Sequence, residues 1–204
     1  KSDLISRREG IADGSDFSCL RRLLSFAFNN SARNDCGAVD LEVIAAELGA
    51  ELATAFGEGL KAYWKKAPPP NPSDYPNGAV PWEAQVALAG AYLSVEDGSD
   101  FSSYSTAEVS TAAQIALWSL PGPPNWFELL HETRTSEVEA ALNPWVLDEA
   151  RALRSGNGVR GALTLSMRCP SSIRRGLLAG ITPLALSGAV PCAATLKELV
   201  RALY

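Results

Sequence analysis

The chain has 204 residues, of which 47% are hydrophobic and 20% are charged, and its net charge at pH 7 is −5. A chain of this size and composition can bury a large core, which excludes a small scaffold that depends on disulfide bonds. The charge is uneven, because no Lys or Arg lies between Lys66 and Arg134, whereas eight basic residues and one acid lie from Arg151 onward. We expect these acidic and basic segments to face each other within the fold or within a larger parent protein.

The cysteines predict buried, reduced thiols and neither a metal site nor a disulfide framework. No two of them form a CxxC motif, and with one histidine in the chain a zinc site would need widely separated ligands. The first residues lack a secretory hydrophobic segment, so we expect a cytoplasmic protein. The four cysteines are Cys19, Cys36, Cys169 and Cys192.

In chain order, the first helical pattern covers residues 17–30, and Asn29, Asn30 and Ser31 then favour a turn. The clearest pattern comes next in residues 40–65, which predict one long helix with Asp40 as its N-cap. The prolines after Lys66 end this helix, because proline lacks a backbone donor and clashes with the preceding turn. Its apolar stripe consists of Leu41, Ile44, Leu48, Leu52, Phe56, Leu60 and Trp64.

The proline-rich loop 67–81 comes next, and we expect it to separate two subregions. Helical periodicity resumes in residues 82–95. Ser105 and Glu108 have the spacing of a capping box, in which each side chain binds the backbone N–H of the other residue. This motif predicts the start of a helix, which the prolines of residues 121–124 end.

Residues 126–130 predict a short helix, and Ser136 with Glu139 predicts a second capping box. The helix after it continues toward Leu153, with Pro144 as a restart point. The uncharged stretch 176–196 is long enough to cross a bilayer, but its two internal prolines favour a helix, a stop and a restart instead. Three further helices are predicted at residues 161–167, 171–186 and 193–203.

This pattern predicts an all-α fold. Few β-branched residues alternate with polar ones, so strands are not expected. About eight to nine helices joined by short loops favour a HEAT-like helical repeat array, or an irregular α-solenoid or bundle. We interpret residues 1–204 as a single helical domain. Because the chain starts at Lys1 and its last residues still have a helical pattern, we expect a fragment of a larger protein.

The hexapeptide DGSDFS occurs twice, at residues 13–18 and 97–102. The flanking sequences do not align, which argues against an internal repeat. A calcium loop starting at Asp97 is also excluded, because Phe101 offers no side-chain oxygen and Ser102 stands where the loop needs glycine. We predict that both copies form the same joint: Asp-Gly ends one helix, Ser or Asp caps the next, and Phe packs on the core.

No phosphate-binding loop, dinucleotide motif or nucleophile elbow occurs, and we assign no catalytic, cofactor-binding or metal-binding residue. One alternative is an enzyme whose site assembles in space near His131, from Glu132 and a nearby Cys or Ser. Another is a helical nucleic-acid-binding domain that uses Arg168, Arg174 and Arg175 in the basic C-terminal third. We interpret the five tryptophans as packing residues, not as a stacking surface.

Two passages together resemble a known family. The first is FGEGLKAYWKK at residues 56–66, and the second is ALWSLPGPPNWF at residues 116–127, with SEVEAAL after it at residues 136–142. In this order they resemble a helical-repeat region of large bacterial NACHT-type ATP-binding proteins of the STAND signalling class. The resemblance spans roughly residues 20–204 and implies a HEAT-like array C-terminal to a nucleotide-binding module. It also implies that the array senses a trigger or restrains the ATPase, often in defence against phage.

We therefore predict a non-catalytic helical scaffold without cofactor, which binds a protein partner or a cognate NTPase module. Nucleic acid is the less favoured partner, and no membrane contact is expected. Trp64, Trp118 and Trp126 are then structural, and exposed residues near the two DGSDFS joints are the favoured contacts.

Overall fold

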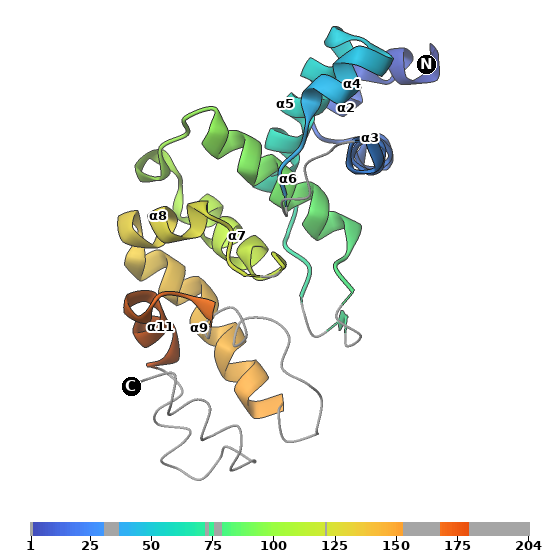
Figure 1. The fold of residues 1–204 in the computed structure, drawn as a ribbon. Helices are drawn as coiled ribbons and strands as arrows, with labels where there is room; N and C mark the ends of the chain where they lie inside the picture. The colour runs from blue at the N-terminus through green and yellow to red at the C-terminus, as the bar shows by residue number, and fades with distance from the viewer. Residues whose placement is uncertain are drawn as a thin grey trace. The chain divides into compact units, whose positions relative to one another are not determined.

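The protein is described from a computed structural model (Figure 1). Ten α-helices have their bounds among the described residues and no strand occurs there, which confirms the predicted all-α class. The HEAT-like repeat arrangement stays a prediction. The described residues are 2–30, 37–71, 74–75, 79–120, 122–152 and 168–179.

The chain divides into two compact units. The first consists of Lys1–Pro70 and Val80–Asp100, and the second of Asn71–Ala79 and Phe101–Tyr204. The proline-rich loop is thus shared between the units, and the second DGSDFS copy begins in the first unit and ends in the second. Each unit has its own set of buried apolar side chains.

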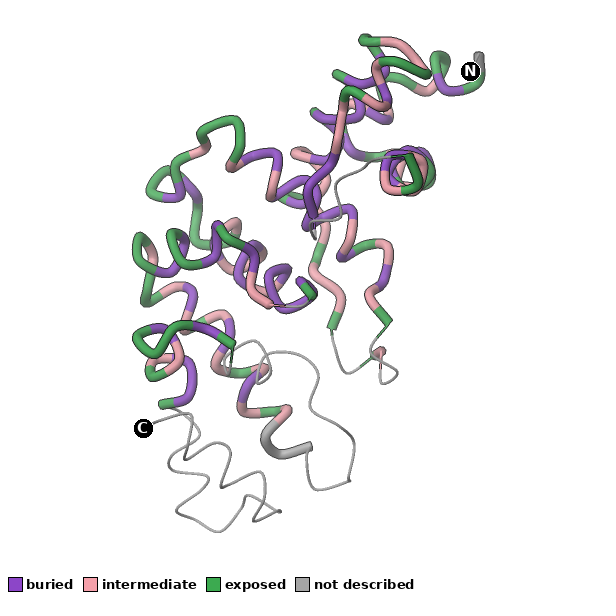
Figure 2. Tube along the Cα trace, viewed as in Figure 1, coloured by how far each residue is buried: buried purple, intermediate pink, exposed green. Residues whose placement is uncertain are grey.

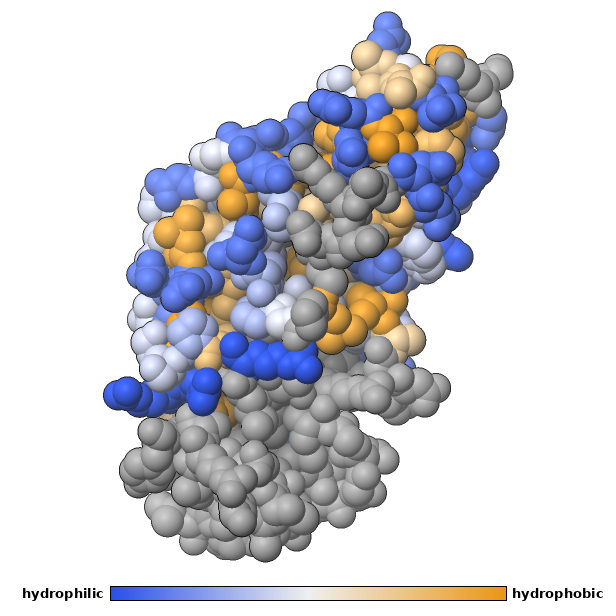
Figure 3. All heavy atoms as spheres, viewed as in Figure 1, coloured by the Kyte–Doolittle hydropathy of each residue, from blue (hydrophilic) through white to orange (hydrophobic). Residues whose placement is uncertain are grey.

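In the first unit, α5 is the central helix, because it packs against α2, α4 and α6. The surface of this unit is mostly hydrophilic on the face shown in Figure 3, with hydrophobic residues in small patches. The helices of the unit are α1 (Ser2–Ser6), α2 (Arg8–Ala12), α3 (Phe17–Asn30), α4 (Leu41–Leu48), α5 (Ala50–Lys66) and α6 (Trp82–Glu96).

Runs of buried residues lie along α5 and α6 (Figure 2). On α5, Leu52, Phe56, Leu60 and Trp64 recur every four residues and are all buried, as the apolar stripe of the sequence predicts. The indole N–H of Trp64 donates a hydrogen bond of 3.0 Å to the hydroxyl of Ser94 on α6. This bond satisfies the one polar group of a fully buried tryptophan.

Two glycines bring the helices of this unit into backbone contact. A Cβ atom at Gly59 would lie 1.9 Å from the carbonyl oxygen of Ile11 in α2, and a Cβ atom at Gly90 of α6 would lie 2.0 Å from that of Leu60. Both distances are far below van der Waals contact, so no larger residue fits without moving a helix. The side of α5 that faces α2 and the side that faces α6 are both packed in this way.

The single helix predicted over residues 40–65 is wrong in one respect, because the segment forms two helices that meet at Gly49. Gly49 has φ 109° and ψ 150°, a conformation that side-chain-bearing residues rarely adopt. The predicted N-cap is confirmed, since the carboxylate of Asp40 accepts a hydrogen bond from the backbone N–H of Glu42. The apolar periodicity runs through the break, which is why the pattern alone predicted one helix.

In the second unit, α9 is the central helix and packs against α7, α8 and α11. The helices whose bounds the structure describes here are the 3₁₀ helix η2 (Phe101–Ser103), α7 (Thr106–Ala116), α8 (Trp126–Thr133), α9 (Thr135–Ala152) and α11 (Ser171–Leu178). Its buried apolar side chains include Val109, Ile115, Phe127, Leu130, Val138, Leu142 and Leu177.

The second capping box is wrong, because α9 begins at Thr135 and Ser136 lies inside the helix. The hydroxyl of Thr135 donates to the carbonyl of His131, and the N–H of Val138 donates to the carbonyl of Arg134. These two hydrogen bonds lie at the junction of α8 and α9, which are separated by the single residue Arg134. Pro144 lies within α9 and is exposed, so it does not restart the helix.

The capping box at the start of α7 is confirmed. The N–H of Glu108 donates to the hydroxyl of Ser105 at 3.2 Å, and the N–H of Ser105 donates to the carboxylate of Glu108 at 2.9 Å. Two backbone donors that helix geometry leaves unpaired are thereby satisfied.

Separate replacement of Ser105 and Ser136 tests whether the first is an N-cap and the second is not. We expect Ser105→Ala to lower the free energy of unfolding by about 1 kcal/mol, because the N-cap bond is lost. Ser136→Ala is the matched control, and we expect it to be neutral or stabilising by a few tenths of a kcal/mol, since alanine favours a helix interior. Urea unfolding followed by circular dichroism measures both. Equal destabilisation by the two substitutions would contradict the assigned helix starts.

Several predictions lie outside the described residues. These are the helices at 161–167 and 193–203, the continuation of the helix at 171–186 beyond Ala179, and most of the uncharged stretch 176–196. In the part of the chain that the structure does describe, no helix combines the length and the apolar character needed to span a bilayer.

Candidate functional site

The two DGSDFS copies end their preceding helices in the same way. Asp13 is the C-cap of α2 and Asp97 is the C-cap of α6. The glycines after them, Gly14 and Gly98, have φ values of 79° and 80°. Each glycine N–H donates to a carbonyl three residues earlier, at 3.2 Å in the first copy and 2.9 Å in the second. The predicted Asp-Gly helix stop is therefore confirmed in both copies.

A lysine of α5 binds each joint. Lys66 donates to the backbone carbonyl of Asp13 at 3.0 Å. Lys61 bridges the carboxylates of Asp97 and Glu58, at 2.6 and 2.7 Å. Burial alone lowers the pKa of Lys61, but its hydrogen bonds to the two carboxylates outweigh burial, so the net shift is upward. The central helix of the first unit thus positions both helix stops.

After the glycine, the first copy packs entirely within the first unit. Asp16 accepts a hydrogen bond from the guanidinium of Arg7 at 2.8 Å and another from the N–H of Cys19 at 3.1 Å, near the start of α3. The ring of Phe17 stacks on Tyr63 of α5, with 5.4 Å between the ring centroids. The predicted roles of Asp as a cap and Phe as a packing residue are both confirmed here.

The second copy ends in different surroundings. Phe101 is buried in the second unit, where its ring contacts those of Tyr104 and Trp126, at centroid distances of 5.3 and 6.3 Å. It begins the 3₁₀ helix η2, and no α-helix starts at this point. The same six residues thus give the same helix stop, but the backbone conformation after the stop depends on the neighbouring residues.

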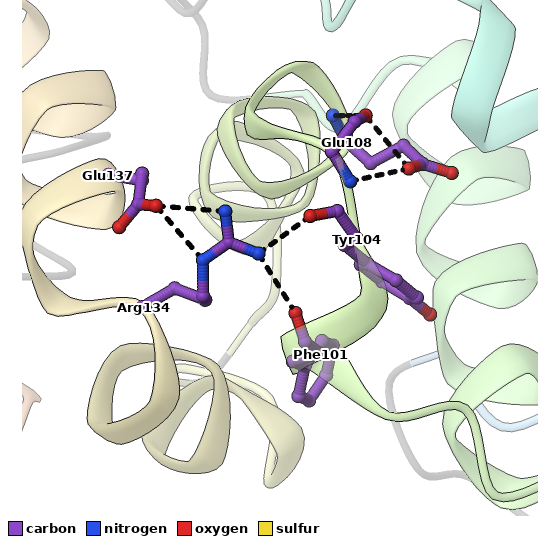
Figure 4. Close-up of polar contacts among 6 residues, drawn as sticks. Phe101, Tyr104, Glu108, Arg134 and Glu137 are labelled. Carbon is purple, nitrogen blue, oxygen red and sulfur yellow. Dashed lines mark hydrogen bonds and ion pairs between the residues drawn. The ribbon is translucent and has the colours of Figure 1, made fainter.

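Arg134 connects the α8–α9 junction to η2 (Figure 4). Its guanidinium donates to the backbone carbonyls of Phe101 and Tyr104, at 3.2 and 2.6 Å, and to the carboxylate of Glu137 through two nitrogens, at 3.0 and 2.8 Å. The hydrogen bonds from Arg134 lower the pKa of Glu137. A planar guanidinium serves three acceptors at once, which a lysine ammonium cannot do with the same geometry.

His131 contacts a different carboxylate from the one that the sequence suggested. Its side chain is 9% exposed, and its Nε2 atom lies 3.5 Å from Oε1 of Glu139 on α9. Glu132, the neighbour considered for an enzyme site, is exposed. The carboxylate of Glu139 also lies over Gly176 of α11, where a Cβ atom would overlap it. His131 therefore lies at a closely packed contact between helices.

The two cysteines that the structure describes are buried. Burial raises the pKa of the Cys169 thiol to about 12; the positive charge of Arg174 acts in the opposite direction, and the carboxylate of Glu128 adds to the increase. Burial, together with Asp16, also raises the pKa of Cys19. Because the thiolate is the nucleophile, neither thiol is activated for catalysis. Cys36 and Cys192 lie outside the described residues.

Alkylation tests the state of these thiols. At pH 7.5 we expect iodoacetamide to modify Cys19 and Cys169 at least about a hundredfold more slowly in the folded protein than in urea, because both are protonated and shielded. Peptide mass spectrometry assigns each rate to its cysteine. A folded-state rate for Cys169 close to that of the unfolded chain would show an accessible thiolate and would favour the enzyme alternative.

The three arginines considered for nucleic acid do not have equivalent environments. Arg168 and Arg175 are exposed, whereas Arg174 is half-buried and its guanidinium donates to the carbonyl of Cys169 at 3.0 Å, just before α11. This contact gives Arg174 a role in holding the start of α11.

Among the described residues, no group of three or more His, Cys, Asp and Glu side chains is placed to hold a metal ion. Trp64, Trp118 and Trp126 are buried, as the packing interpretation predicts, and Trp82 and Trp145 are half-buried. No protein-family model, no curated protein and no solved structure matches this chain.

Proposed function

We propose that this chain is a non-catalytic helical scaffold that acts as a protein-interaction, sensor or regulatory segment of a bacterial STAND-type NTPase, with phage defence as its setting. One observation carries the proposal: the described groups best suited to catalysis are used in packing. The Cys169 thiol has a pKa of about 12, and His131 is buried against Glu139. The resemblance of residues 56–66 and 116–127 to NACHT-type proteins supports the assignment to that class.

The proposed partner is the NTPase module itself, and the proposed contact region lies near the two joints. Lys66 donates to the backbone carbonyl of Asp13 in the first joint, and Lys61 binds the side-chain carboxylate of Asp97 in the second, so the residues beside the joints have defined positions. Glu96, the last residue of α6, is one such exposed residue next to the second joint. A partner that binds here would meet a preformed surface and would lose little conformational entropy in ordering it.

The complete reading frame and a binding measurement test the proposal together. We expect a GxxxxGK[ST] motif N-terminal to this segment, and binding of the purified NTPase module to it in isothermal titration calorimetry. Glu96→Arg should weaken that binding about tenfold, or about 1.4 kcal/mol. Glu83→Arg, at the exposed start of the same helix, is the matched control and should bind normally. A full-length product without an NTPase motif would overturn the assignment to this class.

Two further variants separate the alternatives from the proposal. If the protein is an enzyme with a site at His131, the His131→Ala variant should lose its activity. If the protein is a scaffold, the same variant should still bind its partner. If it binds nucleic acid, its affinity for duplex DNA or RNA should fall steeply with salt and fall again in the Arg168→Ala, Arg175→Ala double variant. Both arginines are exposed.

A further inference from the structure

We draw no further inference here: the strongest candidate, the outward face of α8 where Leu129 is 53% exposed between the exposed Glu128 and Glu132, carries nothing because nothing in the structure shows what covers it.

Discussion

Gly59→Ala should destabilise the first unit by about 2 kcal/mol. The new methyl group would lie 1.9 Å from the carbonyl oxygen of Ile11, and because this is a backbone atom, α2 and α5 must move apart. Because the clash is with a backbone atom, we expect the upper end of the usual cost of overpacking, about 3 kcal/mol, and the helix-forming tendency of alanine returns about 1 kcal/mol. Hydrogen exchange of α2 and α5 peptides, measured by mass spectrometry, should accelerate about thirtyfold.

Gly57→Ala is the matched control, since it makes the same change two residues earlier on the same helix. Its Cβ atom would meet Cδ1 of Leu41 at 3.0 Å, which is the end of a flexible side chain that can rotate away. We expect a change within about 1 kcal/mol, of either sign. If Gly59→Ala exchanges no faster than Gly57→Ala, the close approach of α2 and α5 is incorrect.

Arg134→Ala should lower the free energy of unfolding of the second unit by about 3 kcal/mol. The substitution removes hydrogen bonds to two carbonyls that belong to the buried residues Phe101 and Tyr104, and it leaves Glu137 without its cation. The Phe101 carbonyl keeps the hydrogen bond from the N–H of Tyr104 at 3.3 Å, so what is lost is the hydrogen bonding to a charged donor, which contributes about 1.5–3 kcal/mol. Urea unfolding, combined with hydrogen exchange of peptides from η2 and α9, measures the loss.

Two variants control for the loss of a positive charge. Arg134→Lys keeps the charge but not the planar fork, and we expect it to recover less than half of the lost stability. Arg8→Ala breaks an ion pair with Glu51 whose side chains are 50% and 84% exposed, and should change stability by no more than about 0.5 kcal/mol. Equal effects of Arg8→Ala and Arg134→Ala would show that the carbonyl contacts of Arg134 are unimportant.

Helix ends that depend on local chemistry could be predicted from the sequence. The prolines after Lys66, the capping box at Ser105 and the Asp-Gly stops all act through their own backbone or through residues three or four positions away. The apolar stripe of α5 was equally visible, because burial of one helix face imposes its own period. These features require no knowledge of what lies across the core.

Features that depend on distant residues could not be predicted in the same way. The helices α1 and α2 have few apolar residues, and Ile11 is buried because Gly59 allows close approach. The Ser136–Glu139 spacing fits a capping box, but α9 begins one residue earlier, at Thr135, whose hydroxyl donates to the carbonyl of His131 in α8. In each case the contacting residue, Gly59 for Ile11 and His131 for Thr135, lies on another helix, and the two come close only when the chain folds.

In the candidate site, too, local features could be predicted from the sequence and contacts between distant residues could not. The DGSDFS joints were predicted as helix stops, and their geometry agrees. Lys61 and Arg134, which hold the two ends of the second joint, carried no sequence signal, since each is 30 or more residues from a group that it binds. Glu139 was noted for a different role, and its contact with His131 results from the packing of α8 on α9.

The two identical hexapeptides show that a short identical segment is weak evidence for duplication within a chain. Both copies bend the backbone alike, yet Phe17 stacks on Tyr63 while Phe101 contacts Tyr104 and Trp126. Gene duplication would be expected to leave matching partners around both phenylalanines, as it does in true tandem arrays. Independent selection of the same favourable helix-stop sequence accounts for the two identical hexapeptides without a duplication.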